Sequence, residues 1–540
     1  MSAVDFLSNP LLPSPPSDAE KWSYANPSGL GISATTLFLV AAFGGGSWLF
    51  VQGKNEWLFL YLFFAGIVCV GLLWNAYVYA CSKPLDSVWF DFKRRDYINR
   101  TGYCPTADIF LPSCGEPLDL LDSNYFAISK IQYPKVKVWV CDDSDRPEVG
   151  ALARRYGFEY HVRPIPGEDK KAGSLRYLFA RSEGELIVVF DADFCPRADF
   201  LNETTWLFGE NEDLGLLQTP HFFQVKSMQP IIERGASHLQ HIFFRCTQIG
   251  RDKFGAAICC GSNAVYRRAA LLSNGGSALE PRSEDVATGC VVIIAGYKVR
   301  YLPMVLAAGL SPASLRAIVS QLYRWCIGCY QTRTSGRYLW RRGVPWRVRL
   351  IYSSSALYFF TTGIGVVGFG VPGLVNLLFY PDHIYYANYM AIVPAILLMY
   401  VVRARWSTMK WDSSILYVGF LSGYIYLVAT FDFITGQAAP WIPTGAKRKK
   451  GRQLEKVLFC LQWIPTIGLI LCAMGLFKNY ALIPPYAWTP TIGFWMVKFW
   501  ASRLILKQDY RENSADSILA VVGEYEREKA MLKHYAPRDS

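Results

Sequence analysis

Long runs of apolar residues near both ends of the chain constrain its fold more than any other feature of the sequence. About 20 apolar residues suffice for a helix to cross the hydrocarbon core of a bilayer. Two runs lie near the N-terminus and four follow Pro345, at residues 32–51, 57–80, 355–379, 385–402, 457–477 and 488–506. The sequence therefore predicts a polytopic membrane protein with about six spans. For a weaker run, residues 415–430, a crossing and a position along the membrane interface both stay open.

The charge pattern supports the same conclusion. Only 18% of the residues are charged and 52% are hydrophobic, whereas typical globular domains have about 25% charged residues. The net charge of +12 would suggest nucleic acid in a soluble chain, but here basic residues flank the apolar runs, as at Arg94, Arg95, Arg347 and Lys447–Lys450. Basic flanks mark cytoplasmic ends of spans. We therefore expect no nucleic-acid partner, a multi-pass plasma-membrane protein, and both termini in the cytoplasm.

Residues 104–345 have a different character. Their apolar runs are four to six residues long, as at 108–111, 136–140, 186–190 and 214–217, and they alternate with helical stretches at 146–156 and 171–181. Strands that alternate with helices predict a mostly parallel α/β sheet. Ligands bind such sheets outside the carboxyl ends of the strands. We expect this domain in the cytosol, between a polar segment and membrane hairpin (1–31 and 32–80) and a membrane region and tail (346–508 and 509–540).

Two predicted strands run directly into carboxylates. Asp142 and Asp143 follow the second strand, and Asp191 and Asp193 follow the third. Buried carboxylates are costly unless they bind a cation or hydrogen-bond donors. The Asp-Ala-Asp spacing suits a hard divalent ion that substrate phosphates also hold. The spacing alone is common in solvated turns, but a second strand that ends in carboxylates favours a site.

Two further motifs allow both a chemical and a structural reading. Asp285 follows Glu284 and could act as a general base, although acidic residues are also favoured where a helix begins. Arg324 and Trp325 lie in an amphipathic stretch beside the membrane. They could bind a pyrophosphate and a sugar ring, or they could anchor the chain at the interface.

Taken in order, these motifs resemble the processive membrane glycosyltransferases of family 2, and among them the cellulose synthase catalytic subunits. The resemblance covers residues 112–331 and, more loosely, extends to 451. It departs from the family pattern at Gly115, Ser174 and Ser283. The matching segments are Pro-Ser-Cys-Gly-Glu116, Asp142-Asp143, Lys171-Ala-Gly-Ser, Asp191-Ala-Asp193, Gln218-Thr-Pro-His-Phe-Phe, Cys260-Gly261-Ser262, Ser283-Glu284-Asp285 and Gln321-x-x-Arg324-Trp325.

The resemblance implies a GT-A-type domain inserted between transmembrane helices, with amphipathic interface helices beside it. It implies Mg²⁺ or Mn²⁺ on Asp193 and Asp191, and Asp285 as the catalytic base. Residues 435–451 would form a gating loop. The donor UDP-sugar would contact Glu116, Asp142, Asp143, Lys171, Asp191, Gln321 and Arg324. The polymer would contact Cys260, Gly261, Ser262 and Trp325, and the gating loop would act through Trp441, Thr444 and Lys447.

The implied activity is polymerisation of a β-glucan from UDP-glucose, with inversion at the anomeric carbon and export of the growing chain through the bilayer. The linkage stays open among β-1,4, β-1,3 and mixed. Alternatives are a hyaluronan- or chitin-type synthase and a non-processive enzyme that acts on a lipid acceptor. Further copies of the chain and accessory subunits stay open as partners.

Overall fold

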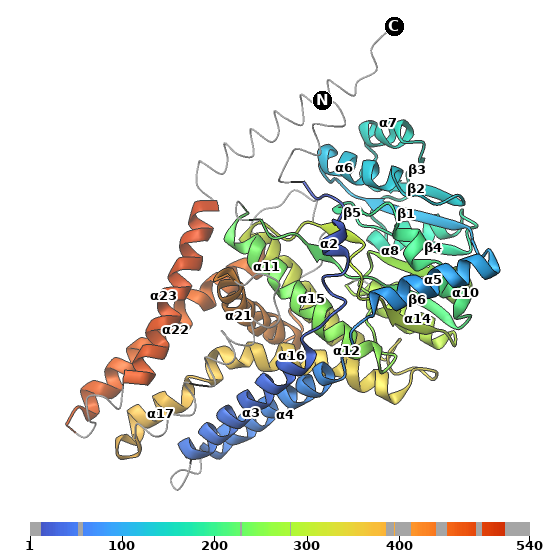
Figure 1. Ribbon diagram of the computed structural model, residues 1–540. Helices are drawn as coiled ribbons and strands as arrows, with labels where there is room; N and C mark the ends of the chain where they lie inside the picture. Colours follow the sequence, from blue (N-terminus) through green and yellow to red (C-terminus); the bar gives the residue numbers. More distant parts are fainter. Residues whose placement is uncertain are drawn as a thin grey trace.

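The computed structural model describes residues 12–51, 58–226, 229–280, 282–384, 394, 412–438, 451–481 and 489–512. Apart from residue 394, the predicted span at 385–402 lies outside the described residues, as do residues 513–540 of the tail. Trp441, Thr444 and Lys447, which the resemblance places in a gating loop, also lie outside them. In the described part, an α/β domain lies beside long helices from both ends of the chain (Figure 1).

A seven-stranded sheet forms the centre of the α/β domain, in the order β3-β2-β1-β4-β8-β6-β9. All neighbouring pairs are parallel except those that β8 makes with β4 and β6. The predicted α/β sheet is therefore confirmed, and its one reversed strand makes it mixed. The strands are β1 (Ala107–Ser113), β2 (Val136–Asp142), β3 (Glu159–His161), β4 (Leu186–Val189), β6 (Leu214–Gln218), β8 (Ala264–Arg267) and β9 (Lys298–Tyr301).

Both faces of this sheet are apolar because helices cover each of them. Successive strand residues point to opposite faces, and strands covered on both sides are continuous apolar runs. Ile109 and Val188 pack with residues of α6 (Leu118–Ser129) and α7 (Pro147–Arg155). Phe110 and Ile187 pack on the other face with residues of α8 (Lys170–Phe179) and α14 (Glu284–Ile294).

A second, three-stranded sheet was not predicted, and its strands are interspersed in the chain among those of the first. Its order is β5-β10-β7, with β5 (Phe194–Pro196) antiparallel and β7 (Phe222–Phe223) parallel to β10 (Ala307–Gly309). Strands of two or three residues are too short to show an alternating pattern. The first of them begins directly after Asp193.

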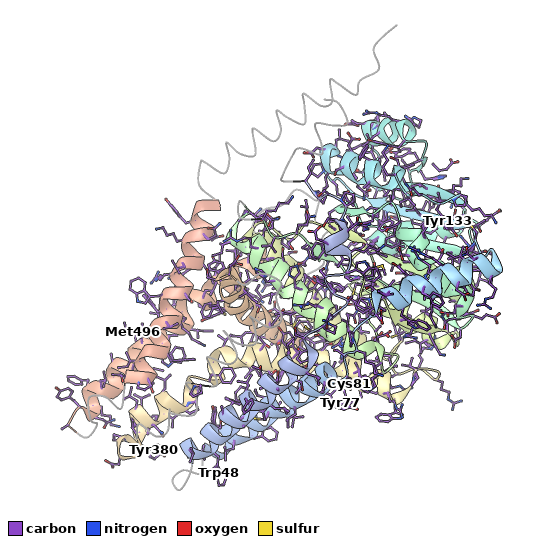
Figure 2. All side chains as sticks on the ribbon, in the orientation of Figure 1. Trp48, Tyr77, Cys81, Tyr133, Tyr380 and Met496 are labelled. Carbon is purple, nitrogen blue, oxygen red and sulfur yellow. The ribbon has the colours of Figure 1, made fainter. Side chains whose placement is uncertain are left out.

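Five helical stretches among the described residues are long and apolar enough to cross a membrane. They are Gly29–Leu49, Tyr61–Ala80, Trp346–Phe379, Ser414–Ile434 and Arg452–Asn479. They belong to α3 (Gly29–Val51), α4 (Leu58–Ala80), α16 (Trp346–Gly368) with α17 (Val371–Phe379), α21 (Ser414–Ile434) and α22 (Arg452–Asn479). Large apolar side chains on the helices from both ends of the chain are exposed, among them Trp48 and Met496 (Figure 2), as expected of surfaces that face lipid.

The count of about six predicted spans is thus approximate. The weak run at 415–430 is α21, a 21-residue apolar helix that packs against α11 (Ile231–Ile242), α15 (Leu315–Thr334), α16 and α22. Its length and hydropathy make it one of the five stretches that could cross a membrane. The predicted span at 488–506 is part of α23 (Thr489–Glu512), which is not among the five stretches and carries Lys498, Arg503 and Lys507.

The remaining elements connect these layers. An amphipathic helix, α15, runs between the α/β domain and the membrane helices (Figure 1). The shorter elements lie around the α/β domain and at the helix ends. Their bounds are α2 (Asp18–Lys21), α5 (Ser87–Thr101), α9 (Phe200–Thr204), α10 (Trp206–Glu210), α11 (Ile231–Ile242), η1 (Phe243–Thr247), α12 (Gln248–Asp252), α13 (Arg268–Leu271), η2 (Leu272–Asn274), α15 (Leu315–Thr334) and η3 (Pro381–His383).

Candidate active site

The two strands that end in carboxylates lie on either side of β1. Ser113 at the end of β1 pairs with Asp142 at the end of β2, and Phe110 pairs with Val189 at the end of β4. Because these strands are parallel, their carboxyl ends meet at one edge of the sheet. The predicted neighbourhood of Asp142-Asp143 and Asp191-Asp193 is therefore present.

The Asp142 side chain holds the turn that follows β2. It is fully buried and accepts hydrogen bonds from the backbone amides of Ser144 and Arg146, each at 3.0 Å. The hydroxyl groups of Ser113 and Tyr160 also donate to it, at 3.4 and 3.3 Å. Its oxygens are thus used by the protein, and they hold the turn that carries Asp143.

Asp143 forms an ion pair that sequence reasoning missed. Arg163 donates from Nε to Asp143 Oδ1 at 2.7 Å and from Nη2 to Oδ2 at 2.5 Å, while Ser174 Oγ donates to Oδ2 at 3.2 Å. Paired N–H donors of this kind fix the plane of a carboxylate. Arg163 lies in a loop without regular pattern, 20 residues after its partner, so no sequence signal identifies it.

Lys171 connects Asp191, which follows β4, to the loop at Gly261. Its ammonium group forms an ion pair with Asp191 and donates to the carbonyl oxygen of Gly261 at 2.9 Å. Burial alone would lower the pKa of Lys171, but the charges of Asp191, Glu284 and Asp285 raise it. The lysine is therefore held in its charged form among three carboxylates.

Gly261 allows these groups to approach one another. Its φ of +79° lies in the left-handed region, which favours glycine. A Cβ atom added there would lie 3.1 Å from the Cβ of Asp285 and 3.4 Å from Lys171 Nζ. A side chain at this position would fill the space between the acidic motif and the lysine.

Gln218 fastens the 260–262 loop beside the Asp-Ala-Asp turn. Its side chain donates to the carbonyl oxygen of Ser262 at 2.8 Å and accepts from the amide of Cys260 at 2.7 Å. Ser262 Oγ in turn accepts from the backbone amide of Asp191 at 2.9 Å. The three residues predicted to line the polymer site are thus held next to the residues predicted to hold the metal.

Three carboxyl groups in this region have raised pKa values. Burial and the neighbouring charge of Asp191 raise the pKa of Asp193 to about 7. Burial and the charge of Glu284 raise the pKa of Asp285 to about 7. Burial also raises the pKa of Glu116, whose Oε2 accepts from the amide of Cys114 at 2.6 Å. Perturbed carboxyl groups gathered at one edge of a sheet are typical of functional sites.

The helix that carries Gln321, Arg324 and Trp325 reaches this group of residues. All three lie on α15 and are partly exposed, and Trp325 packs against the apolar cluster of α15, α21 and α22. The positive charge of Arg324 acts on Asp285, where it opposes the rise in pKa. The structure therefore brings together the acidic motifs, the 260–262 loop and the aromatic-basic motif of α15.

Within the described residues, no group of three or more His, Cys, Asp and Glu side chains is arranged to hold a metal ion. Asp191 and Asp193 can supply carboxylate oxygens, but a cation bound there would need further ligands. A diphosphate and water commonly supply them for Mg²⁺. The carboxylates present therefore fit a cation that binds together with its substrate.

The chain is similar to known glycosyltransferases. Residues 186–434 match the model of glycosyl transferase family group 2. The UDP-forming cellulose synthase catalytic subunit of Pseudomonas fluorescens (strain SBW25) is 33% identical over 306 residues, which are 54% of this chain and 40% of that protein. Cellulose synthase 1 of Komagataeibacter xylinus is 32% identical over 294 residues, 54% of this chain and 19% of that protein.

The chain spans less than half the length of these curated relatives. A solved structure of a mannosyltransferase from Pyrobaculum calidifontis, in complex with GDP-Man and Mn²⁺, is similar with a TM-score of 0.48 and 14% identity, over 75% of this chain and 99% of that one. Residues 186–434 thus match a glycosyltransferase family 2 domain, and the curated homologues of the chain are cellulose synthase catalytic subunits.

Proposed function

We propose that this protein is a processive, inverting glycosyltransferase that polymerises a β-glucan from UDP-glucose and moves the product across the membrane. The observation that carries the proposal is the position of Lys171. Its ammonium group contacts Asp191 on the donor side and the Gly261 carbonyl oxygen on the acceptor side, and Gly261 lies against Asp285. A donor and an acceptor bound on these two sides would meet beside one candidate base.

On the donor side, Asp193 and Asp191 would hold Mg²⁺ or Mn²⁺ together with the diphosphate. Such a cation offsets the negative charge that develops on the leaving UDP. Burial and the neighbouring charge of Asp191 raise the pKa of Asp193, and a divalent cation shared by the two carboxylates would offset this repulsion. Asp143, whose orientation Arg163 fixes, would contact the nucleotide. Glu116 would lie on the same side of the donor.

On the acceptor side, Asp285 would act as the general base. It would take the proton of the acceptor hydroxyl group while the hydroxyl oxygen attacks the anomeric carbon and the bond from that carbon to UDP breaks. Attack from the face opposite UDP converts the α-linked donor to a β-linked product. A base works best with a pKa near the operating pH, and the pKa of about 7 for Asp285 supports this role.

Helix α15 would hold the substrates in register. Arg324 would bind the pyrophosphate, Gln321 would face the donor, and Trp325 would stack against the terminal sugar beside Cys260, Gly261 and Ser262. Helix α15 contacts α16, α21 and α22, and the polymer would leave between the membrane helices. In this arrangement the α/β domain and both termini are cytoplasmic, and the membrane is the plasma membrane.

The test is polymer synthesis by purified protein in lipid nanodiscs. We expect UDP-[¹⁴C]glucose and Mg²⁺ or Mn²⁺ to yield free UDP and a long product that linkage-specific β-glucanases degrade, and EDTA to stop both. A strong preference for UDP-N-acetylglucosamine would indicate a hyaluronan- or chitin-type synthase. A lipid that carries a single sugar would contradict the processive step. UDP release that is unchanged by EDTA would contradict the metal assignment.

A further inference from the structure

The polar segment before the first membrane helix packs onto the α/β domain, and the proposed mechanism does not use it. From Leu12 to Ala25 this segment runs from α6 past β5 to the loop before β10. Leu12, Lys21, Tyr24 and Ala25 are buried in it. A segment that only precedes a membrane helix needs no such burial, which indicates that its contacts hold part of the α/β domain in place.

Its first contact lies next to the Asp-Ala-Asp turn. The carbonyl oxygen of Pro13 accepts hydrogen bonds from Ser123 Oγ at 3.1 Å and from Cys195 Sγ at 3.4 Å. Cys195 lies in β5, two residues after Asp193. Ser123 precedes Asn124 on α6, and Asn124 donates from its amide group to the carbonyl oxygens of Asp191, at 3.4 Å, and Phe194.

The turn itself is short and depends on these neighbours. Its own backbone bond joins the Phe194 amide to the Asp191 carbonyl oxygen at 3.0 Å. Asn124 closes the turn from one side. Ser123, which precedes Asn124, and Cys195, which follows Phe194, both donate to the carbonyl oxygen of Pro13. The carboxylates of Asp191 and Asp193 thus lie in a turn whose neighbours Ser123 and Cys195 both contact the N-terminal segment.

The second contact is a buried ion pair. Lys21 Nζ lies 2.8 Å from Asp199 Oδ2 and 2.8 Å from Glu203 Oε1, and its side chain is 10% exposed. Arg197, which follows β5, donates to the carbonyl oxygen of Pro16 at 2.7 Å and to Asp18 at 2.7 Å. These bonds connect the segment to residues 197–203, which follow the Asp-Ala-Asp turn and β5.

The third contact ties the segment to the other strands of the small sheet. The amide of Val305 donates to the carbonyl oxygen of Lys21 at 2.9 Å, just before β10. Gln224, which follows β7, reaches Glu20 at 3.4 Å. Because β10 pairs with both β5 and β7, the segment touches the surroundings of all three strands.

We propose that residues 12–25 form a clasp that positions the Asp191–Asp193 turn for the cation and diphosphate, with Lys21 and Ser123 as positioning residues. The proposal rests on the proposed function for the ligand of the turn. It concerns the geometry of the turn and not the chemistry: neither Lys21 nor Ser123 touches substrate. A weakened clasp therefore lowers cation affinity and loosens the turn while the remaining machinery stays intact.

The test compares Lys21→Met and Ser123→Ala with matched controls in full-length protein. Lys93→Met removes an ion pair with Glu210 that is 3.2 Å long and exposed, and Ser129→Ala removes an exposed hydroxyl group from the same helix as Ser123. The readouts are the binding of Mn²⁺ with UDP, followed by the loss of the free-Mn²⁺ EPR signal, and hydrogen exchange of the Phe194 amide. Mutations behind metal ligands typically weaken metal binding about 10–100-fold.

We expect Lys21→Met to weaken Mn²⁺ binding about 10-fold and to speed exchange at Phe194, Ser123→Ala to do both to a smaller degree, and Lys21→Arg to restore them. The two controls should match wild type. If Lys21→Met lowers the melting temperature but leaves Mn²⁺ binding and Phe194 exchange unchanged, the segment is only a structural support and the clasp is wrong. If wild type transfers no sugar but the variants still lose Mn²⁺ binding, the proposed function fails and the clasp stands.

Discussion

Gly328 on α15 lies directly against Ser283, the residue that precedes α14. A Cβ atom on Gly328 would overlap the Ser283 hydroxyl oxygen and lie 3.1 Å from the carbonyl oxygen of Arg282. Arg324 lies one turn earlier on α15, and Asp285 lies two residues after Ser283. This contact therefore sets the spacing between the helix proposed to hold substrate and the proposed base.

Replacement of this glycine should impair activity more than folding. Gly328→Ala forces α15 and α14 apart, and overpacking of this kind typically costs about 1–3 kcal/mol. We expect the rate of UDP release to fall about 10-fold or more, since a small displacement of positioned groups strongly reduces rate. Gly419→Ala on α21 is the control, because a Cβ there meets nothing within 4 Å. Equal rates for the two variants would mean that the contact does not set the geometry.

At a saturating concentration of Mg²⁺ or Mn²⁺, which keeps Asp193 ionised, the pH dependence of the reaction should report on Asp285. Its pKa, raised by burial and Glu284 to about 7, means that the group is protonated below that pH and cannot accept a proton. We expect kcat/KM to rise about 10-fold per pH unit on the acidic side and to level off above about pH 7. The measurement is UDP release between pH 5.5 and 8.5 at fixed ionic strength. A flat profile across that range would exclude a base with this pKa.

The Arg163–Asp143 pair should matter for stability. The two side chains are only 6% and 4% exposed, and removal of one partner leaves a buried charge uncompensated. We expect Arg163→Met to lower the free energy of unfolding by about 3–5 kcal/mol, measured as a loss of thermal stability. The control Lys137→Met breaks an ion pair with Glu159 in which both side chains are 52% exposed, so its cost should stay below about 1 kcal/mol.

The double variant Arg163→Met/Asp143→Asn distinguishes the causes of that loss. If the uncompensated charge is responsible, the second change should recover much of the lost stability. If the loss stays as large, the packing of the arginine side chain is responsible instead. In the single variant Arg163→Met, UDP binding should also be weaker, because Asp143 loses the group that fixes its orientation.

The parts of the fold with strong periodic patterns were predictable from the sequence. The buried strands β1, β2, β4 and β6 are continuous apolar runs that end at turn residues, so their positions and their parallel arrangement followed from pattern alone. The small sheet was missed because β7 has two residues and its pairing with β10 joins segments more than 80 residues apart. Nothing local marks such a pairing.

The candidate site divides in the same way. Asp191, Asp193 and Asp285 stand out because carboxylates at strand ends and beside apolar helices demand an explanation. Arg163, Gln218 as a support of the 260–262 loop, and the N-terminal clasp did not stand out. Their roles depend on contacts across long stretches of chain, such as Lys21 with Glu203, 182 residues away. The sequence thus indicates which groups carry chemistry more readily than which groups hold them.

The proposed base is tested most directly by Asp285→Asn. The amide keeps the shape of the carboxyl group and its hydrogen-bonding capacity, including the bond that Asp285 Oδ1 accepts from the Val286 amide at 2.7 Å, but it cannot take a proton at neutral pH. General-base catalysis typically contributes about 10²–10⁴-fold in rate, so polymer synthesis should fall by about two orders of magnitude or more. UDP binding should stay near that of wild type, because the nucleotide would be held by Asp143 and the cation.

The matched control for that variant is Glu284→Gln, which removes a charge from the same turn of α14. We expect a smaller loss of rate, together with a lower pKa for Asp285, because the charge of Glu284 is one cause of the rise. The acidic limb of the pH profile should therefore move toward lower pH in this variant. Both quantities come from UDP release and polymer mass in nanodiscs, with UDP binding followed separately. If Asp285→Asn makes polymer at near wild-type rates, another group is the base. If the variant loses UDP binding as well as polymer synthesis, Asp285 stabilises the start of α14 and takes no part in proton transfer.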